Sequence, residues 1–377
     1  MQKYFISFCL LIFFVSVANA QVFEITDSVF YEENKTIKEV RVVKVKDLYG
    51  LVNDTGKILL PTQYTSIEFL GKNDSTCKAW HGIAKVEQNG QFGLINANGS
   101  GITALIYEEI EFWQNTCQSE DFESKVLKIR QYGKYGLTDS KGNIFIRPSY
   151  DRIDLLTDSE GKISTPAVVR VLKSGKFGFL ELKTKNILPS QYEEISFLQQ
   201  FQATKKTKAF CVLKIKSKGK YAVKNPQDAD EIKFDYDQIF TFDSLSQMAL
   251  VKIKNNFGYI NIKGKLEIKA EYSEASLFRN GIAIVKKNNK TLLINAKEKV
   301  LASNYENLVF LIETKDFSKS NPKYHELILA KKDGKLGLLD SEGKTIFPCE
   351  YEVLDFQIEN DTFKSTKNGD QKILRWK

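Results

Sequence analysis

The chain has 377 residues, of which 42% are hydrophobic and 27% charged, so it is long enough and apolar enough to bury a sizeable core. Its 55 basic and 47 acidic residues give a net charge of +8, a mild excess for this length. The densest basic segments, residues 205–208 and 214–220, are interpreted as a solvated face. The composition therefore predicts no nucleic-acid partner.

Residues 1–20 are typical of a cleaved signal peptide. Lys3 supplies the positive charge, residues 4–17 form an apolar stretch, and Ala18-Asn19-Ala20 has the form of a cleavage site before Gln21. The alternative is a membrane anchor, but spanning a bilayer takes about 20 apolar residues. Because no later segment is apolar enough to cross a membrane, we expect an exported mature chain without a membrane span. Its location would be periplasmic, cell-surface or secreted.

The rest of the chain repeats one spacing eight times. In the regular copies an aromatic residue followed by Gly or Ala precedes a tyrosine by fifteen positions, and the two looser copies begin at Lys290 and Leu336. A fixed unit copied along a chain indicates an array built from one supersecondary piece. The regular copies start at Tyr49, Phe92, Tyr135, Phe177, Tyr221 and Phe257, and the eight tyrosines are Tyr64, Tyr107, Tyr150, Tyr192, Tyr236, Tyr272, Tyr305 and Tyr351.

Each copy predicts three or four short strands. In the sixth copy, residues 248–254, 257–262 and 266–270 alternate between apolar and polar positions and are separated by Asn- and Gly-containing turns. Residues 272–278 follow as a fourth short strand or a bend. Glycines that end the second turn of several copies predict a positive φ.

The predicted fold is therefore all-β, and its domains follow the repeats. Residues 1–20 are the signal peptide, 21–39 an N-terminal strand segment or cap, and 40–356 the eight repeats. Residues 22–31 read as a strand pair, and 357–377 as a C-terminal hairpin, half-repeat or cap. A closed, propeller-like arrangement is slightly favoured, and an open curved array remains the alternative.

The pattern resembles the WG (KWG) repeat family of bacterial proteins. The third copy carries Gly133-Lys134-Tyr135-Gly136, Asp139-Ser140-Lys141-Gly142 and Pro148-Ser149-Tyr150-Asp151, and the eighth is similar from Gly334 to Glu352. The resemblance covers about residues 40–356, although no copy has the tryptophan of the family name, and copies five and seven lose the glycine. It implies a β-rich repeat domain, often exported or envelope-associated, with no shared catalytic residues.

The eight repeat tyrosines have two interpretations. They could form a ladder on which sugar rings stack, or each could fill the seam between neighbouring units. A residue required in every copy is more often structural, so we favour the seam. Tyr150→Ala should then cost roughly 3–5 kcal/mol, as large core truncations do.

Four cysteines remain after the signal peptide. Cys77 and Cys117 lie in polar insertions of adjacent repeats, and equivalent loops of adjacent repeats lie side by side in an array. Because an exported protein meets oxidising conditions, we predict a Cys77–Cys117 disulfide. Cys211 and Cys349 lie in strand-like stretches and are expected to be buried thiols.

No catalytic or metal-binding constellation is evident. His81 and His325 have no suitably spaced partners, and the Asp-x-x-Gly segments read as turns rather than calcium loops. Nucleotide-binding, hydrolase and metalloprotease motifs are missing from the sequence. We therefore expect no enzyme activity, no metal and no cofactor.

Aromatic residues in the inserted loops are the candidates for recognition because they break the repeat. Trp80, Phe112 and Trp113 suit an anchor for a partner, or alternatively pack against the neighbouring loop. The favoured function is a non-enzymatic scaffold that binds an unknown protein at the cell envelope through its loops. The alternatives are glycan or cell-wall polymer binding through exposed aromatics and, less favoured, an enzyme on a propeller scaffold.

Overall fold

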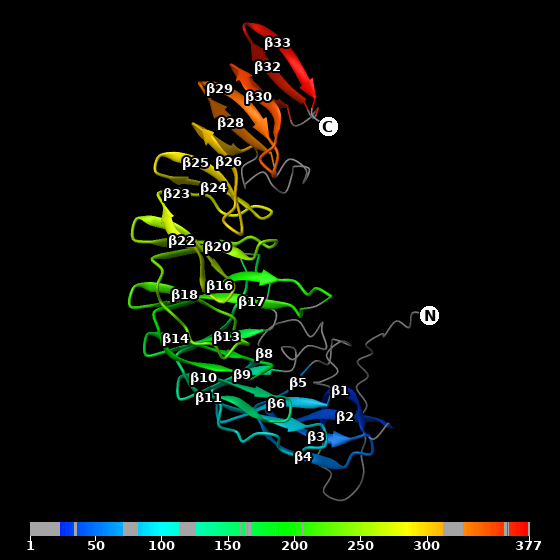
Figure 1. The fold of residues 1–377 in the computed structure, drawn as a ribbon. Helices are drawn as coiled ribbons and strands as arrows, with labels where there is room; N and C mark the ends of the chain where they lie inside the picture. Colours follow the sequence, from blue (N-terminus) through cyan, green and yellow to red (C-terminus); the bar gives the residue numbers. More distant parts are fainter. Residues whose placement is uncertain are drawn as a thin grey trace, which may run out of the picture. The chain divides into compact units, whose positions relative to one another are not determined.

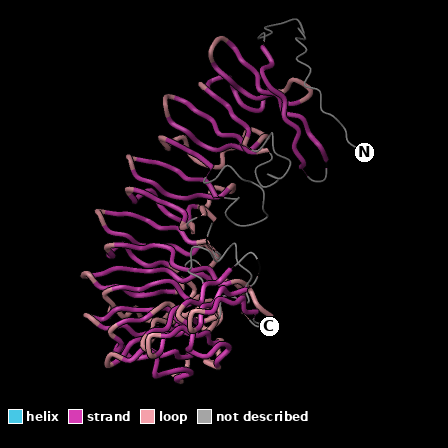
Figure 2. Tube along the Cα trace, turned by 90° about the horizontal axis from the view of Figure 1, so that it is seen from above, coloured by secondary structure: helices cyan, strands magenta, loops and turns pink. Residues whose placement is uncertain are grey.

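The computed structural model describes residues 23–33, 36–70, 82–112, 126–158, 160–162, 164, 167–184, 186–205, 207–311, 327–357, 360 and 362–375. Within these ranges every regular element is a β-strand (Figures 1 and 2). The prediction of an all-β array of small sheets is confirmed. The chain divides into two compact units: unit 1 is residues 1–154 with 171–174, and unit 2 is residues 155–170 with 175–377.

The strands form small antiparallel sheets in chain order. The first sheet contains β1 (Glu24–Glu33), β2 (Thr36–Val45), β3 (Leu48–Asn53) and β4 (Ile58–Tyr64). The second contains β5 (Ser66–Phe69), β6 (Ile83–Gln88) and β7 (Gln91–Asn96), and the third β8 (Glu109–Phe112), β9 (Val126–Gln131), β10 (Lys134–Asp139) and β11 (Ile144–Tyr150). A fourth sheet has the order β12 (Arg152–Leu155), β13 (Val168–Lys173), β14 (Lys176–Glu181) and β15 (Ile187–Tyr192).

The remaining sheets lie in unit 2 and follow the same plan. The fifth contains β16 (Glu194–Phe201), β17 (Phe210–Ser217) and β18 (Lys220–Lys224). The sixth contains β19 (Gln238–Phe242), β20 (Met248–Ile253), β21 (Asn256–Asn261) and β22 (Leu266–Tyr272), and the seventh β23 (Glu274–Ala275), β24 (Ile282–Lys287), β25 (Lys290–Asn295) and β26 (Val300–Tyr305). The eighth contains β27 (Asn307–Phe310), β28 (Ile328–Lys332), β29 (Lys335–Leu339) and β30 (Thr345–Tyr351), and the ninth β31 (Val353–Gln357), β32 (Thr362–Lys367) and β33 (Asp370–Arg375).

The strand after each repeat tyrosine belongs to the next sheet. β19 follows Tyr236 and pairs with β20, whose hairpin partner β21 carries the next aromatic–Gly pair. The expected fourth strand over residues 272–278 is accordingly replaced by the short β23, which opens the seventh sheet. At the N-terminus the prediction of a strand pair over residues 22–31 is wrong, because β1 is one continuous strand that opens the first sheet.

The aromatic residue and the tyrosine of a copy face each other across two strands. Phe257 of β21 pairs with Tyr272 of β22, and the first, third and fourth copies pair in the same way. In the second and fifth copies the pairing is an isolated bridge. The register shifts beside the pair of Phe257 and Tyr272, which brings the third strand close to the glycine. A Cβ on Gly136 would lie 2.4 Å from the main-chain oxygen of Ile146, so the position requires glycine.

The seventh copy corrects the predicted spacing. Thr291, not Lys290, pairs with Tyr305, so the interval there is one residue shorter. Leu292 therefore occupies the glycine position, opposite a shortened third strand. In the fifth copy Ala222 has the glycine position, and the pairing of Tyr221 with Tyr236 is an isolated bridge rather than part of a third strand.

In most copies the side chain of the first residue of the second turn accepts hydrogen bonds from main-chain N–H groups of that turn. Asp139 Oδ1 accepts the N–H groups of Lys141 and Asn143, both at 2.8 Å, and Asn261 Oδ1 accepts those of Lys263 and Lys265. Gly142 closes the turn with a φ of 81°. These carboxamide and carboxylate oxygens serve turn geometry.

The core of unit 2 lies between successive sheets. Val223 and Tyr236 of the fifth repeat pack with Val251 and Ile260 of the sixth sheet in one buried cluster. The repeat therefore buries its apolar positions against its neighbour rather than inside a single sheet.

Candidate functional site

The acidic residue after most repeat tyrosines has a structural role. Asp237 accepts a hydrogen bond from Lys220 Nζ at 2.6 Å and one from the N–H of Lys254 at 2.6 Å in the next hairpin turn. The hydrogen bond from Lys220, together with that from Lys254, holds the pKa of Asp237 below its ordinary value. The other carboxylates that accept turn N–H groups in this way are Glu108, Asp151, Glu193, Glu306 and Glu352.

The aromatic residues of the aromatic–Gly pairs lie beneath cations. Lys252 Nζ lies 5.7 Å from the ring centroid of Phe257, and Lys128 Nζ lies 5.2 Å from that of Tyr135. Each ring is half-buried. A cation over the face of an aromatic ring is attracted by the ring quadrupole. These rings are therefore covered by side chains of their own sheets.

The repeat tyrosines mostly lie in the core. Tyr64, Tyr107, Tyr192, Tyr236 and Tyr272 are buried, whereas Tyr150, Tyr305 and Tyr351 are half-buried. Tyr236 donates its hydroxyl proton to the main-chain oxygen of Gly264 at 2.7 Å, in the second turn of the next sheet. Burial raises the pKa of Tyr236 to about 12. The interpretation of the eight tyrosines as an exposed ladder for stacking sugar rings is therefore wrong, because five of them are buried.

A cavity of about 370 Å³ in unit 1 is the best candidate for partner recognition among the sequence-predicted positions. Its apolar floor comes from neighbouring sheets, with Leu70 after β5, Ile110 and Phe112 on β8, and Leu127 on β9. Leu70, Ile110 and Leu127 are buried, and Phe112 is half-buried. The structure thus brings Phe112, a predicted recognition residue, into a concave site.

Two equivalent ion pairs border this cavity. Lys85 Nζ lies 2.9 Å from Glu68 Oε2, and Lys128 Nζ lies 2.9 Å from Glu111 Oε2. Each pair joins directly opposite residues of two strands, which is the favourable cross-strand arrangement for opposite charges. In the sequence these four residues are ordinary polar positions of alternating strands. The sequence analysis therefore did not predict that they form two neighbouring ion pairs.

Two carboxyl groups of β8, those of Glu109 and Glu111, influence each other's pKa. The hydrogen bond between Glu109 and Glu111 raises the pKa of Glu109, aided by burial, and lowers that of Glu111, aided by Lys128. Burial opposes the charge on Lys128, but its hydrogen bond to Glu111 and the nearby acidic groups hold its pKa above its ordinary value. Glu111 and Lys128 therefore remain a charged pair at neutral pH.

The other predicted recognition and disulfide residues lie outside the described residues. These are Trp80, Trp113, Cys77, Cys117, His81 and His325. Leu70 directly precedes the segment 71–81, and Phe112 directly precedes the segment 113–125, so the cavity lies where the chain enters both insertions.

The two remaining cysteines are free thiols of different accessibility. Cys211 is buried, and burial raises the pKa of its thiol to about 12. Cys349 is half-buried rather than buried, and burial raises the pKa of its thiol as well. Within the described ranges no cluster of His, Cys, Asp or Glu is suited to hold a metal ion. Those ranges also contain no apolar helix of membrane-spanning length.

The fold and its repeated turns define a class of protein, the tandem β-repeat proteins. The model of the family described as "WG containing repeat" matches residues 49–91 and 257–290. These two segments of the chain are therefore similar to WG-containing repeats. No curated protein matches the chain.

Several solved structures overlap with the chain at low similarity. A crystal structure of the eukaryotic initiation factor is 12% identical over 93% of both chains, with a TM-score of 0.31. The Hsv2 protein of Kluyvelomyces marxianus is 10% identical over 55% of this chain and 68% of that chain, with a TM-score of 0.27. The extracellular domain of a putative one component system from B. thetaiotaomicron is 12% identical over 96% of this chain and 59% of that chain, with a TM-score of 0.24.

Proposed function

We propose that this chain is an exported, non-enzymatic repeat scaffold that binds a protein partner at the cell envelope. Export rests on the signal-peptide pattern of residues 1–20. The scaffold role rests on the repeat architecture, since arrays of this kind present a regular framework from which insertions extend.

The observation that carries the proposal is the cavity beside Phe112. It combines an apolar floor with two ion pairs at its border, and it lies where two long insertions begin. Protein interfaces commonly pair an apolar, well-packed centre with a polar rim. The cavity suits an apolar side chain of the partner, with polar partner groups facing Glu68, Lys85 and Glu111.

The ordinary roles of the repeated residues favour a scaffold over an enzyme. The recurring acids cap hairpins, most of the recurring tyrosines are buried, and the recurring Asn and Asp residues accept turn N–H groups. Phe112 ends β8 rather than lying in an inserted loop, and Phe69 and Phe310 hold the same position in their copies. The cavity beside Phe112, rather than its place in the repeat, makes it the residue to test for recognition.

Affinity capture tests the proposal. The chain from Gln21 onward is immobilised and exposed to envelope extract of the source organism, and a second portion of extract is first treated with protease. We expect a specific protein that Phe112→Ala bait retains poorly and that protease treatment removes. Capture that survives protease treatment, or capture of nothing, contradicts the proposal.

A further inference from the structure

The fifth copy departs from the repeat at residues 225–235. After β18 the chain turns at Asn225, whose Oδ1 accepts the N–H of Gln227, and it then reaches Tyr236 without forming a third strand. In most other copies this place is taken by a regular strand such as β22, although the second copy is also irregular at residues 101–107. An irregular segment in a largely regular array is a place to look for function.

Lys224 occupies a position that belongs to the core. It is 9% exposed, and the equivalent residue of each copy lies three positions after the residue that pairs with the repeat tyrosine. The equivalents in the other copies are Val52, Ile95, Thr138, Leu180, Ile260, Ile294 and Leu339, all of them buried. A buried charge is costly unless hydrogen bonds compensate it.

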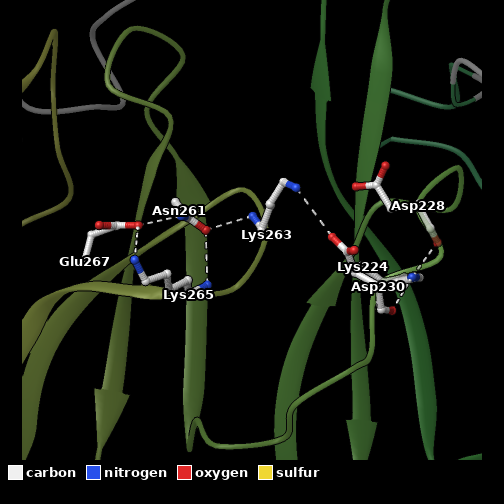
Figure 3. Close-up of polar contacts among 7 residues, drawn as sticks. All are labelled: Lys224, Asp228, Asp230, Asn261, Lys263, Lys265 and Glu267. Carbon is white, nitrogen blue, oxygen red and sulfur yellow. Dashed lines mark hydrogen bonds and ion pairs between the residues drawn. The ribbon is translucent and has the colours of Figure 1, made fainter.

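The ammonium group of Lys224 fixes the course of the irregular segment. Its Nζ donates to the main-chain oxygens of Asp228 and Asp230 at 2.5 and 2.7 Å (Figure 3). Burial lowers the pKa of Lys224, while the charges of Asp228 and Asp230 oppose this effect. Because main-chain oxygens take these bonds, the two aspartate carboxylates are not consumed by Lys224. The carboxylate of Asp230 points toward Lys263, at 3.6 Å.

A cavity of about 390 Å³ lies between this segment and β15. Its apolar part includes Phe179 and Leu188, and the ring of Phe234 stacks on Tyr192 with centroids 5.8 Å apart. This volume falls within the roughly 300–1,000 Å³ of typical small-molecule sites.

The polar lining of the cavity includes Lys224, whose Nζ donates to two main-chain oxygens, and otherwise consists mainly of acceptors. Asp228 is half-buried, and Asp230 and Glu231 are exposed at the mouth. Asn186 uses its amide hydrogens on the main-chain oxygens of Pro226 and Gln227, so Oδ1 is the acceptor that this side chain offers. A ligand for this lining must bring several hydrogen-bond donors together with an apolar face.

We propose that this cavity binds a neutral sugar ring. The aromatic and aliphatic floor would contact the C–H face of the ring, and Asp228 and Glu231 would accept its hydroxyl protons. An acidic sugar would be repelled by the carboxylates, and a purely apolar ligand would leave them desolvated without partners. This site lies in unit 2, is separate from the cavity beside Phe112, and does not depend on the proposed protein partner.

An oligosaccharide array with neutral and uronic-acid members tests this inference on the chain from Gln21 onward. The best neutral probe and a matched uronic-acid oligosaccharide are then titrated by calorimetry. We expect the neutral probe to bind about tenfold or more tightly than the acidic one, because the carboxylate of a uronic acid would be repelled by Asp228 and Glu231. No neutral binder on the array, or equal affinity for the acidic probe, overturns the proposal.

Isosteric variants locate the site. Asp228→Asn combined with Glu231→Gln should weaken the neutral probe by about tenfold while leaving the Lys224 contacts to main-chain oxygens in place. Glu267→Gln, an exposed carboxylate change on the neighbouring β22, is the matched control and should leave affinity unchanged. Phe234→Leu should also weaken binding, since it removes the aromatic platform. Full affinity in both the double variant and Phe234→Leu overturns the assignment.

Discussion

Lys220 Nζ lies 2.6 Å from Asp237 Oδ1, and this ion pair links the two halves of one repeat. Asp237 also accepts the N–H of Lys254 in the hairpin turn of the next repeat. The same pairing, seventeen positions apart, joins Lys134 to Asp151 and Lys335 to Glu352. The lysine of the Gly-Lys-aromatic-Gly segment thus holds the acid that follows the tyrosine. Two motifs that look separate in the sequence form one contact.

Acid should weaken the fold through these capping carboxylates. The folded-state pKa of Asp237 lies below its ordinary value of 3.8, so its ionised form stabilises the fold above that pH, and this contribution disappears as the pH falls through the lowered pKa. Asp237→Asn should lower the melting temperature at neutral pH and flatten its fall from about pH 5 to about pH 2. Thermal melts across that range measure both effects. A melting temperature that is unchanged at every pH would contradict the capping role.

Gly136→Ala should destabilise the chain. The added Cβ would meet the main-chain oxygen of Ile146, and a backbone clash of this kind cannot be relieved by moving a side chain. The expected cost is about 1–3 kcal/mol, as for other overpacked sites. Chemical denaturation measures it, and Ala222→Gly is the reciprocal control, because that copy has no regular third strand to clash with. Equal and small effects in the two variants would refute the explanation.

Tyr236 should contribute more to stability than Tyr150. Tyr236 is 3% exposed and hydrogen-bonds to Gly264, whereas Tyr150 is half-buried, so the roughly 3–5 kcal/mol of a core truncation is expected for Tyr236→Ala and less for Tyr150→Ala. Tyr236→Phe, which removes the hydroxyl alone, should cost about 0.5–1.5 kcal/mol. Denaturant midpoints of the three variants test this order. A larger loss for Tyr150→Ala would contradict it.

The raised pKa of Tyr236 adds an alkaline signature. Its value of about 12 exceeds the ordinary 10.0, so the neutral phenol stabilises the fold below pH 10, and this contribution is lost as the pH rises through the folded-state value. Tyr236→Phe should flatten the alkaline fall in melting temperature.

Thiol titration should separate the four cysteines of the chain from Gln21 onward. Cys211 should react slowly in the native state, because its thiol is buried and its pKa is raised to about 12. If Cys77 and Cys117 form the predicted disulfide, the unfolded chain without reductant exposes the thiols of Cys211 and Cys349 alone. Equal counts with and without reductant would sink the disulfide prediction.

The array itself could be predicted because its signals are local. The spacing from Phe257 to Tyr272, the turn at Asn261 and the period-two alternation between them all describe contacts within one copy. We did not predict that the strand after each tyrosine belongs to the next sheet. The strand β23, for example, pairs with β24 of the following copy, and its own residues give no sign of that pairing.

The sites were less predictable for the same reason. Phe112 was singled out as an aromatic residue of an inserted loop, which is wrong because it ends β8. The cavity floor beside it, contributed by Leu70 after β5 and Leu127 on β9, comes from different parts of the chain and was not predicted. Lys224 could have been recognised from the sequence, because the equivalent position is apolar or threonine in the other copies. Its two carbonyl partners depend on an irregular segment whose course no periodicity describes.

The most direct test of the central claim compares Phe112→Ala with Phe310→Ala against the captured protein. Both phenylalanines lie five positions after a repeat tyrosine and are half-buried. Phe310 lies on β27, packs against Arg279 and is not among the residues that line the cavity. The account predicts that Phe112→Ala weakens binding by about tenfold or more, as interface anchors do, and that Phe310→Ala leaves it unchanged. Equal affinities for the two variants in calorimetric titrations would contradict the account.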